Sequence, residues 1–295
     1  MDMYNPFQEK YEEETKDSDY IERSIKGDMK ALEAIVLRHQ AWIYNIAVAM
    51  TGDIHIAEDI TQEVLIKIIT KLSSYDSHKA SFRTWLYRIV VNHILNMREN
   101  QKEKFFSKIE IQSGLDFSIT QHPDNRKSMQ PGYSLIHEEV KIACVTCALL
   151  CLSRKERIIF TLGTIFNTSD RIGAEICGTS KENFRKILSR SRAKLYNFFN
   201  KNCSLMNENN SCTCDQQTEL LIKAGMINLN NLLVKQDAHG SIQDMLGEVI
   251  NELEDSYFEF VALFREQPFL KGPDMIQWLR DLFNRSDFKG LFIKQ

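Results

Sequence analysis

Apolar side chains recur every three or four residues over most of this chain, which is the spacing of one buried face of an α-helix. One apolar stripe runs through residues 25–36 and a second through residues 42–50. Thr51-Gly52-Asp53 then interrupts the pattern, which resumes over residues 60–72. The alternation of apolar and polar positions that marks β-strands is almost absent. The pattern therefore predicts an all-α fold.

Changes in this pattern divide the chain into five segments. Residues 1–18 are polar and acidic, and we expect them to form a disordered tail. Helical patterns fill residues 19–100 and 135–202, whereas residues 101–134 contain prolines and glycines and are predicted to be a flexible linker that can hold short helices. Residues 203–295 form a cysteine-containing extension with further amphipathic helices. We thus expect two small helical domains, a linker and a helical C-terminal extension.

The charge of the chain is unevenly distributed along its length. The net charge is only −3, which argues against a protein that coats nucleic acid without preference. Basic residues concentrate in residues 79–108 and 181–201, while both ends of the chain are acidic. Two basic stretches in an acidic chain predict two confined contacts with nucleic acid. Two solvated helix faces would give the same charge pattern.

Several classes of protein lack support in the sequence. The first residues contain no apolar core of a signal peptide, and no apolar run approaches the roughly 20 residues that span a bilayer. We therefore expect a cytoplasmic protein without membrane insertion, whose cysteines are thiols or metal ligands rather than disulfides. A glycine-rich phosphate loop, an HExxH motif and paired catalytic carboxylates are also missing. We expect a protein that is not an enzyme.

The stretch from Ala57 to Gln101 is the most informative part of the chain. An acidic amphipathic helix leads through a polar loop into FRTWLYRIVVNHIL, where aromatic residues alternate with arginines. Cations hold phosphates while aromatic rings accept unstacked bases, so this block is predicted to contact an opened DNA strand. Trp85 and Leu86 are expected to pack in the core. The predicted DNA contacts are Lys79, Ser81, which also serves as N-cap, Arg83, Arg88 and Asn92.

A second block, residues 151–199, has the pattern of a helix-turn-helix. A short helix, Ile172–Cys177, is followed by the turn Gly178-Thr179-Ser180 and a basic helix. Glycine in the turn and Ser180 as N-cap are typical of this motif. The N-terminal part of its second helix enters the major groove of duplex DNA. The residues predicted to contact DNA are Lys181, Asn183, Arg185, Lys186, Ser189 and Arg190.

In order and spacing, the two blocks resemble bacterial RNA polymerase sigma factors of the extracytoplasmic-function type. The resemblance covers about residues 19–200. It implies that the first domain is region 2, which melts promoter DNA at the −10 element, and that the second is region 4, which binds the −35 element. It also implies a protein that binds core RNA polymerase, through the β′ clamp helices and the β flap, and directs promoter recognition, DNA melting and transcription initiation.

The sequence AEDITQEV resembles the part of the family that grips the β′ clamp helices, which assigns core binding to Asp59, Gln62 and Glu63. Two departures from the family pattern stand out. Ile172-Gly173-Ala174 replaces the usual Glu-Ile-Ala, and Asn96 stands where an acid is usual. A rival hypothesis is a stand-alone helix-turn-helix regulator that binds duplex DNA without polymerase. That hypothesis leaves the first block without a purpose.

The cysteines form two groups. Cys144, Cys147 and Cys151 share one apolar helical face and are expected to be buried. A polar loop contains the second group, which could supply three of the four ligands of a structural zinc site, with His239 or another cysteine as the fourth. A reduced thiol cluster or a redox-responsive knot is the alternative. The second group consists of Cys203, Cys212 and Cys214.

The amphipathic helices beyond the second cysteine group are predicted to need a partner surface. They can fold back on the two helical domains as built-in regulation. They can also bind a separate protein, either an anti-sigma factor or a recruiting protein.

Overall fold

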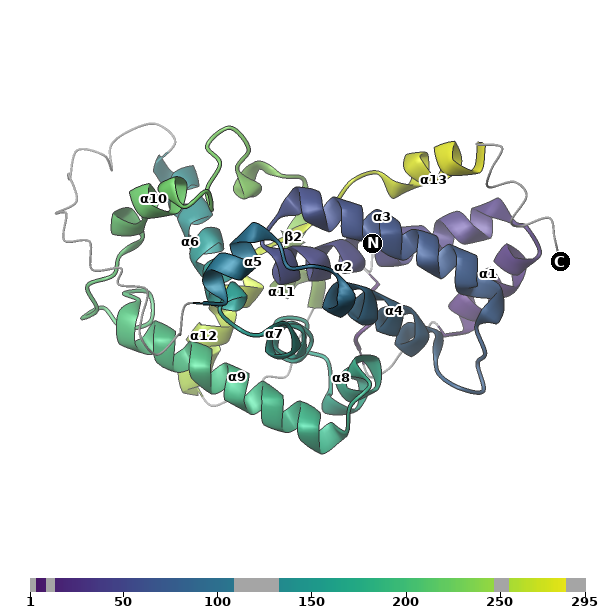
Figure 1. Cartoon of the computed structure of the whole chain (residues 1–295), viewed down its shortest axis with the longest axis horizontal. Helices are drawn as coiled ribbons and strands as arrows, with labels where there is room; N and C mark the ends of the chain where they lie inside the picture. Colours follow the sequence, from purple (N-terminus) through teal and green to yellow (C-terminus); the bar gives the residue numbers. More distant parts are fainter. Residues whose placement is uncertain (1–3, 9–13, 109–132, 247–254, 285–295) are drawn as a thin grey trace.

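The structure is a computed structural model that describes residues 4–8, 14–108, 133–246 and 255–284. These residues are mainly helical, as the apolar spacing predicts (Figure 1). Among them, no helix combines the length and the apolar character that crossing a membrane requires.

The first group of helices covers the first predicted domain, residues 19–100, and extends into the predicted tail and linker on either side. Gly52, with a φ of 64°, ends α2, and the Asp53 side chain accepts hydrogen bonds from two backbone N–H groups at the start of α3. The break predicted at these residues is therefore confirmed. The members of the group are α1 (Glu14–Ile25), α2 (Met29–Thr51), α3 (Ile54–Lys71), the 3₁₀ turn η1 (Leu72–Ser74), α4 (Phe82–Asn96) and α5 (Gln101–Phe106).

The second group contains the predicted helix-turn-helix, formed by α8 and α9. Gly178, with a φ of 60°, ends α8, and the Ser180 side chain caps α9 by accepting a hydrogen bond from the Asn183 N–H. Both features agree with the prediction from the sequence. The members are α6 (Tyr133–Leu150), α7 (Arg154–Phe160), the π-helical turn η3 (Thr161–Ile165), α8 (Asp170–Cys177) and α9 (Lys181–Asn202).

The C-terminal extension contains helices and one small sheet. Strands β1 and β2 pair antiparallel, with Ala238 opposite Leu270. Pro268 is the first residue of β2, a position where the missing N–H is tolerated, and the apolar pattern did not predict this strand. The elements are α10 (Cys214–Lys223), the 3₁₀ turn η4 (Leu233–Lys235), β1 (Ala238–Ser241), α11 (Ile242–Leu246), α12 (Asp255–Arg265), β2 (Pro268–Leu270) and α13 (Met275–Asn284).

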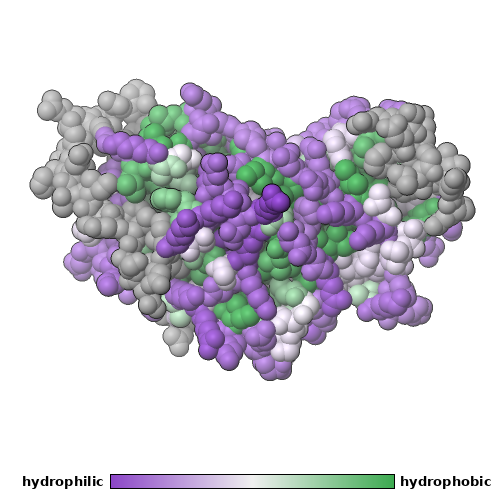
Figure 2. Space-filling model, viewed as in Figure 1, coloured by the Kyte–Doolittle hydropathy of each residue, from purple (hydrophilic) through white to green (hydrophobic). Residues whose placement is uncertain are grey.

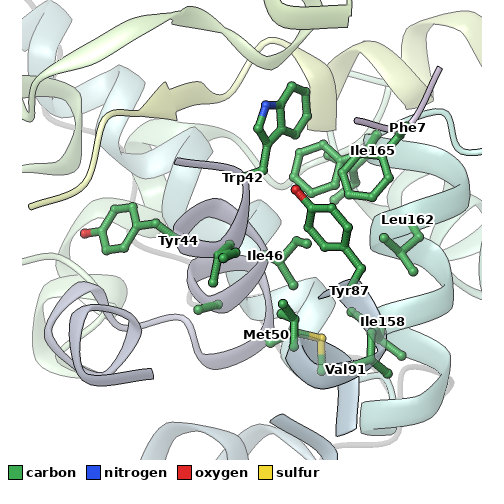
Figure 3. Packing of buried hydrophobic residues seen from close by; sticks show 14 of the residues in the cluster. Phe7, Trp42, Tyr44, Ile46, Met50, Tyr87, Val91, Ile158, Leu162 and Ile165 are labelled. Atoms are coloured by element: carbon green, nitrogen blue, oxygen red, sulfur yellow. The ribbon is translucent and has the colours of Figure 1, made fainter. Parts of the chain in front are cut away.

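The two groups of helices share one hydrophobic core. Met50 and Tyr87, from α2 and α4, pack toward Ile158 of α7 and Leu162 of η3 (Figure 3). Buried residues of α12, β2 and α13 belong to the same core. The predicted domains therefore lie in direct contact in this structure, and the extension packs on both of them.

Part of the predicted disordered tail is ordered. Phe7 is only 2% exposed and lies in the shared core, and α1 begins at Glu14, inside the segment predicted to be disordered. The prediction was wrong here because Phe7 buries a large aromatic surface and neighbouring backbone carbonyls accept hydrogen bonds, although the segment has no periodic pattern. In the predicted linker, α5 occupies Gln101–Phe106, and residues 109–132 lie outside the described residues.

Candidate nucleic-acid interface

The acidic face of α3 is available to a partner. Asp59 and Glu63 are exposed and Gln62 is half-buried, while Ile60 and Val64 of the same helix are buried in the core. The i and i+4 spacing places the two carboxylates on one side of the helix. Such a pair suits a basic partner surface. This agrees with the core-polymerase contact that the sequence resemblance implies for these residues.

Glu63 also lies near α4. Its Oε2 is 3.5 Å from Nε2 of His93, and the Nζ of Lys67 contacts Nδ1 of the same ring. Burial lowers the pKa of His93, Lys67 lowers it further, and Glu63 acts in the opposite direction. The neutral ring therefore joins α3 to α4 without adding a positive charge to the acidic face.

Three of the five residues predicted to contact an opened DNA strand lie exposed. Lys79, in the loop before α4, pairs with Asp76 at 3.2 Å, and Asn92 lies on the exposed face of α4. Arg88 is exposed too, but its Nε donates to the Glu175 carbonyl at 2.6 Å. Ser81 acts as the predicted N-cap, since its side chain accepts a hydrogen bond from the Thr84 N–H.

Arg83 is not on the surface, so its prediction as a DNA contact is wrong for this structure. Its side chain is 3% exposed, and Nη1 donates to the carbonyls of Pro6 at 3.2 Å and Gln8 at 2.9 Å. Arg83 precedes the buried Tyr87 by one helical turn, so both side chains point inward. This i, i+4 relation was visible in the sequence. The carbonyls that receive the guanidinium were not.

Aromatic side chains gather at the start of α4. Phe82 and Trp85 stack with ring centroids 5.6 Å apart, and Tyr75 lies 5.5 Å from Trp85. Leu86 is buried as predicted, whereas Trp85 and Tyr75 are only half-buried. The rings therefore form a cluster with a partly open edge, close in the chain to the exposed Lys79. Partly exposed aromatic rings of this kind are used in other proteins to stack on unpaired bases.

The basic face of α9 is exposed over its first three turns. Lys181, Lys186, Ser189 and Arg190 lie on the surface, which is mostly hydrophilic in the view of Figure 2. Arg185 is also exposed and pairs with Asp170 of α8. These are the residue types that bind phosphates and base edges in the major groove.

Two polar residues of α9 serve the fold. Asn183 is half-buried and donates from Nδ2 to the Thr179 hydroxyl at 2.7 Å, which braces the turn before α9. Arg192 is half-buried and donates to the Thr164 hydroxyl and the Gly163 carbonyl, both at 2.9 Å. Burial lowers the pKa of Arg192. Arg192 therefore anchors α9 to η3.

A glycine explains the departure at Ile172-Gly173-Ala174. A Cβ at Gly173 would lie 2.3 Å from Cζ of Phe184, a buried residue of α9. The aromatic ring occupies the space that a side chain at residue 173 would need. Glycine here allows the close packing of α8 against α9 that orients the basic face.

The first two turns of α4 lie against α8. The Thr84 hydroxyl donates to Oε2 of Glu175 at 3.2 Å, next to the bond between Arg88 and the Glu175 carbonyl. Helix α4 and the helix-turn-helix are therefore in contact, an arrangement that no local pattern predicts.

A buried ion pair network also links the two groups of helices. Glu103 of α5 is 1% exposed and accepts hydrogen bonds from Arg154 and from Arg157 of α7 at 2.7–2.9 Å. Burial alone would raise the pKa of Glu103, but the hydrogen bonds and the two guanidinium charges lower it. Arg157 additionally donates to the carbonyls of Leu149, Leu150, Leu152 and, in α2, Met50. Sequence reasoning missed this network.

Four cysteines line one cavity of about 270 Å³ beside the end of α9. Cys144 of α6, which was assigned to an apolar face, lies there with Cys203, Cys212 and Cys214. Burial raises the pKa of Cys212 and of Cys214 to about 11, so both thiols are protonated at neutral pH. All seven cysteines are free thiols.

The predicted zinc site is not assembled. Within the described residues, which include Cys203, Cys212, Cys214 and His239, no group of three or more histidine, cysteine, aspartate or glutamate side chains is close enough to hold a metal ion. The zinc prediction is therefore not supported. The reduced thiol cluster and the redox-responsive knot stay predictions.

Comparison with known proteins identifies the first group of helices. The family model for sigma-70 region 2 matches residues 35–103, which run from α2 into α5. The sigma factor SigW of Bacillus subtilis, of the extracytoplasmic-function type, is 34% identical over 91 residues, or 31% of this chain and 48% of that protein. The sigma-E factor of Escherichia coli is 37% identical over 86 residues, or 28% of this chain and 43% of that protein.

Matches that cover more of this chain have lower sequence identity. SigM of Bacillus subtilis is 26% identical over 160 residues, covering 54% of this chain and 89% of that protein. The solved structure of CnrH in complex with the cytosolic domain of CnrY matches with a TM-score of 0.45 and 19% identity, covering 63% of this chain and 97% of that chain. The chain spans less than half the length of SigW and sigma-E. Residues 35–103 therefore belong to the sigma-70 region 2 family, and the chain is related to the bacterial extracytoplasmic-function sigma factors.

Proposed function

We propose that this chain is a sigma factor, a dissociable subunit that binds core RNA polymerase and directs it to promoters. The observation that carries the proposal is the region 2 match over residues 35–103, combined with an exposed acidic face on α3 in the same segment. The curated relatives that match this segment bear the name sigma factor. The chain itself supplies binding and positioning, and the polymerase carries out the chemistry.

Core binding is assigned to Asp59, Gln62 and Glu63. Two carboxylates four residues apart on an exposed helix face attract a basic surface and steer it during association. Gln62, between them in the chain, adds a donor and an acceptor for hydrogen bonds. The partner surface that fits these side chains is the basic helical hairpin of the polymerase β′ clamp.

Strand opening is assigned to the loop before α4 and to α4 itself. Lys79 and Asn92 are exposed, and the Tyr75–Phe82–Trp85 cluster presents a partly open aromatic edge. A cation for the phosphate and a ring for the base are what a separated strand needs. We assign the duplex contacts at a −35 element and a contact to the β flap to the helix-turn-helix domain (α7–α9). Its helix α9 carries the exposed basic face.

In vitro transcription with bacterial core polymerase tests the proposal. With this chain present, transcripts should start at defined new positions on genomic DNA. Asp59→Ala combined with Glu63→Ala should weaken binding to core about tenfold or more, because two charges of the docking face are lost. Glu219→Ala, an exposed acid on α10, is the matched control and should bind like the original chain.

Two outcomes would overturn the proposal. The first is the absence of any binding to core polymerase. The second is sequence-specific duplex binding and regulation without polymerase, which would support the stand-alone helix-turn-helix regulator. New start sites that need the acidic face of α3 would exclude that rival.

A further inference from the structure

Trp42, in the middle of α2, is contacted by three phenylalanines from distant parts of the chain. Its ring centroid lies 5.5 Å from that of Phe7, 5.4 Å from that of Phe166 and 4.8 Å from that of Phe269. Phe7 belongs to the N-terminal segment, Phe166 follows η3 in the helix-turn-helix domain, and Phe269 lies in β2 of the extension. All four rings are at most 2% exposed (Figure 3 shows Trp42 and Phe7). Region 2, the helix-turn-helix domain, the N-terminal segment and the C-terminal extension thus meet at one side chain.

The N-terminal segment binds region 2 by more than Phe7. The Tyr4 carbonyl accepts a hydrogen bond from Nε1 of Trp42 at 2.9 Å, and the Tyr4 ring lies 4.0 Å from the Arg38 guanidinium. The carbonyls of Pro6 and Gln8 receive the Arg83 guanidinium. An arginine of the strand-opening helix is therefore held by residues 4–8 of the same chain.

The extension also binds α2. The Asn45 side chain accepts a hydrogen bond from the Leu270 N–H at 3.0 Å and donates to the Leu270 carbonyl at 2.7 Å, and both bonds are buried. Arg280 of α13 makes a bidentate pair with Glu33 of α2, at 2.7 and 2.9 Å. Backbone and side-chain pairing together fix residues 268–280 on region 2.

The extension also reaches the helix-turn-helix domain. Arg265, at the end of α12, is 2% exposed and donates from Nε and Nη2 to the Thr164 carbonyl at 3.0 and 2.9 Å. Its Nη2 also donates to Oδ1 of Asn167 at 3.0 Å. Three residues after Arg265, β2 begins and leads to Asn45 of α2. Region 2 and the helix-turn-helix domain, the two units to which DNA binding is assigned above, are therefore connected through the extension.

We propose that residues 4–8 and 268–280, together called the terminal clasp, form an autoinhibitory lock on the two DNA-binding units. While the clasp is closed around Trp42, the first two turns of α4 stay against α8, and Arg83 and Arg88 are engaged within the protein. Release of the clasp frees α4 for a separated DNA strand. The functional meaning of the lock rests on the proposed sigma function, whereas the closed arrangement can be tested without it.

Two variants open the clasp from opposite ends. Phe7→Ala removes a ring that contacts both Trp42 and Phe166, without substituting any residue of region 2. Arg280→Glu places two acids against each other on the surface, and Glu33→Arg added to Arg280→Glu restores a pair of opposite charges. Phe258→Ala is the matched control, since that ring is 57% exposed on α12.

Hydrogen exchange of the α4 and α8 backbone amides reports the closed arrangement without DNA or polymerase. Binding of a fluorescein-labelled single-stranded oligonucleotide of mixed sequence reports access to α4. Phe7→Ala and Arg280→Glu should speed exchange in α8 and at the start of α4, and the charge-swapped double variant should restore slow exchange. The apparent dissociation constant for the oligonucleotide should fall about tenfold if the open fraction rises from about a tenth toward one.

Unchanged exchange in both opening variants would overturn the lock. If Phe7→Ala speeds exchange throughout α2 and α3, that variant has lost its fold. The test of the lock then rests on Arg280→Glu and on the double variant Glu33→Arg/Arg280→Glu. Faster exchange at α4 and α8 without tighter oligonucleotide binding would support the clasp and contradict the DNA-binding role of α4. The two proposals can therefore fail separately.

Discussion

Individual residues in this protein show how a departure from a family pattern follows from packing. Gly173 stands in a short helix where a larger residue is usual, and the Phe184 ring occupies the space that its side chain would take. The Phe184 ring of α9 fills the space beside α8 that a side chain at residue 173 would otherwise fill, so the two helices still pack closely. The unusual residue therefore allows the two helices to pack closely while the basic face of α9 stays exposed.

Gly173→Ala should destabilise the protein by about 1–3 kcal/mol, because the added methyl group overlaps the Phe184 ring and the surrounding core has no room to relax. Urea denaturation followed by circular dichroism measures the change. Adding Phe184→Leu to Gly173→Ala should recover part of the loss, since the smaller side chain makes room. An equal or greater loss in the double variant would show that the overlap is not the cause.

His39 makes stability depend on pH. Burial lowers its pKa, and Asp17, with its carboxylate 3.8 Å from Nε2, opposes the shift without cancelling it. The Arg38 charge lowers the pKa of His39 further, and the hydroxyls of Tyr4 and Tyr87 lie within hydrogen-bond distance of the two ring nitrogens. In the unfolded chain, the His39 ring binds a proton at a higher pH than it does in the folded protein. The contribution of His39 to stability is therefore complete above the ordinary histidine pKa of about 6.5 and is lost as the pH falls below that value.

The unfolding free energy should therefore decrease between pH 7 and pH 5, with a slope from this single group of at most about 1.4 kcal/mol per pH unit. Chemical denaturation at each pH gives the slope. His39→Gln should flatten it, whereas His55→Gln, at an exposed position, should leave it unchanged. The same slope in all three proteins would contradict the assignment to His39.

At the scale of elements, α9 separates residues that bind from residues that hold the helix. Its outer face carries Lys186 and Arg190, and its inner face carries Arg192, which is tied to η3. A basic helix is therefore not uniformly a DNA contact. Only burial and hydrogen bonding distinguish the two kinds of arginine.

Lys186→Ala and Arg190→Ala should each weaken duplex binding and reduce the slope of log affinity against log salt by about 0.9, the value for one phosphate contact. Fluorescence anisotropy over a salt series measures the slope. Lys223→Ala, an exposed lysine of α10, is the control. A slope that stays constant in both variants would remove these two residues from the interface.

At the scale of the whole molecule, Arg157 joins parts of the chain that lie far apart in sequence. It connects α7 with Glu103 of α5 and with the Met50 carbonyl at the end of α2. Its side chain is 2% exposed, so no water replaces a lost partner. The desolvation of the guanidinium lowers its pKa, although Glu103 opposes the shift.

Arg157→Met should therefore cost about 3–5 kcal/mol, because it leaves a buried carboxylate and several carbonyls short of a donor. Thermal and urea denaturation measure the loss. Arg171→Met, at an exposed residue whose pair with Glu175 spans 3.5 Å, should change stability by less than about 1 kcal/mol. Equal effects of the two substitutions would contradict a structural role for the buried network.

The sequence alone determined the local features of this protein. Apolar spacing indicated helices over most of the chain, turn residues placed the breaks at Gly52 and Gly178, and the order of motifs indicated region 2 and the helix-turn-helix. The apolar stripe through residues 25–36, however, crosses the end of α1 at Ile25 and the start of α2 at Met29. These features depend on neighbours within about one helical turn, so a short stretch of sequence contains their cause. The exposure of Asp59 and Glu63 belongs with them, since the opposite face of α3 is apolar.

Only the tertiary structure decided which polar and aromatic side chains are exposed to a partner and which are buried within the protein. Arg83 has the same chemistry as Arg88, yet carbonyls about 75 residues earlier in the chain bury it. Phe7 lies in a segment without a pattern, and Trp42 receives rings from residues 7, 166 and 269. Cys144 joins three thiols from beyond α9 because α6 packs against the extension. Such contacts depend on how whole elements meet in space, and no local pattern contains that information.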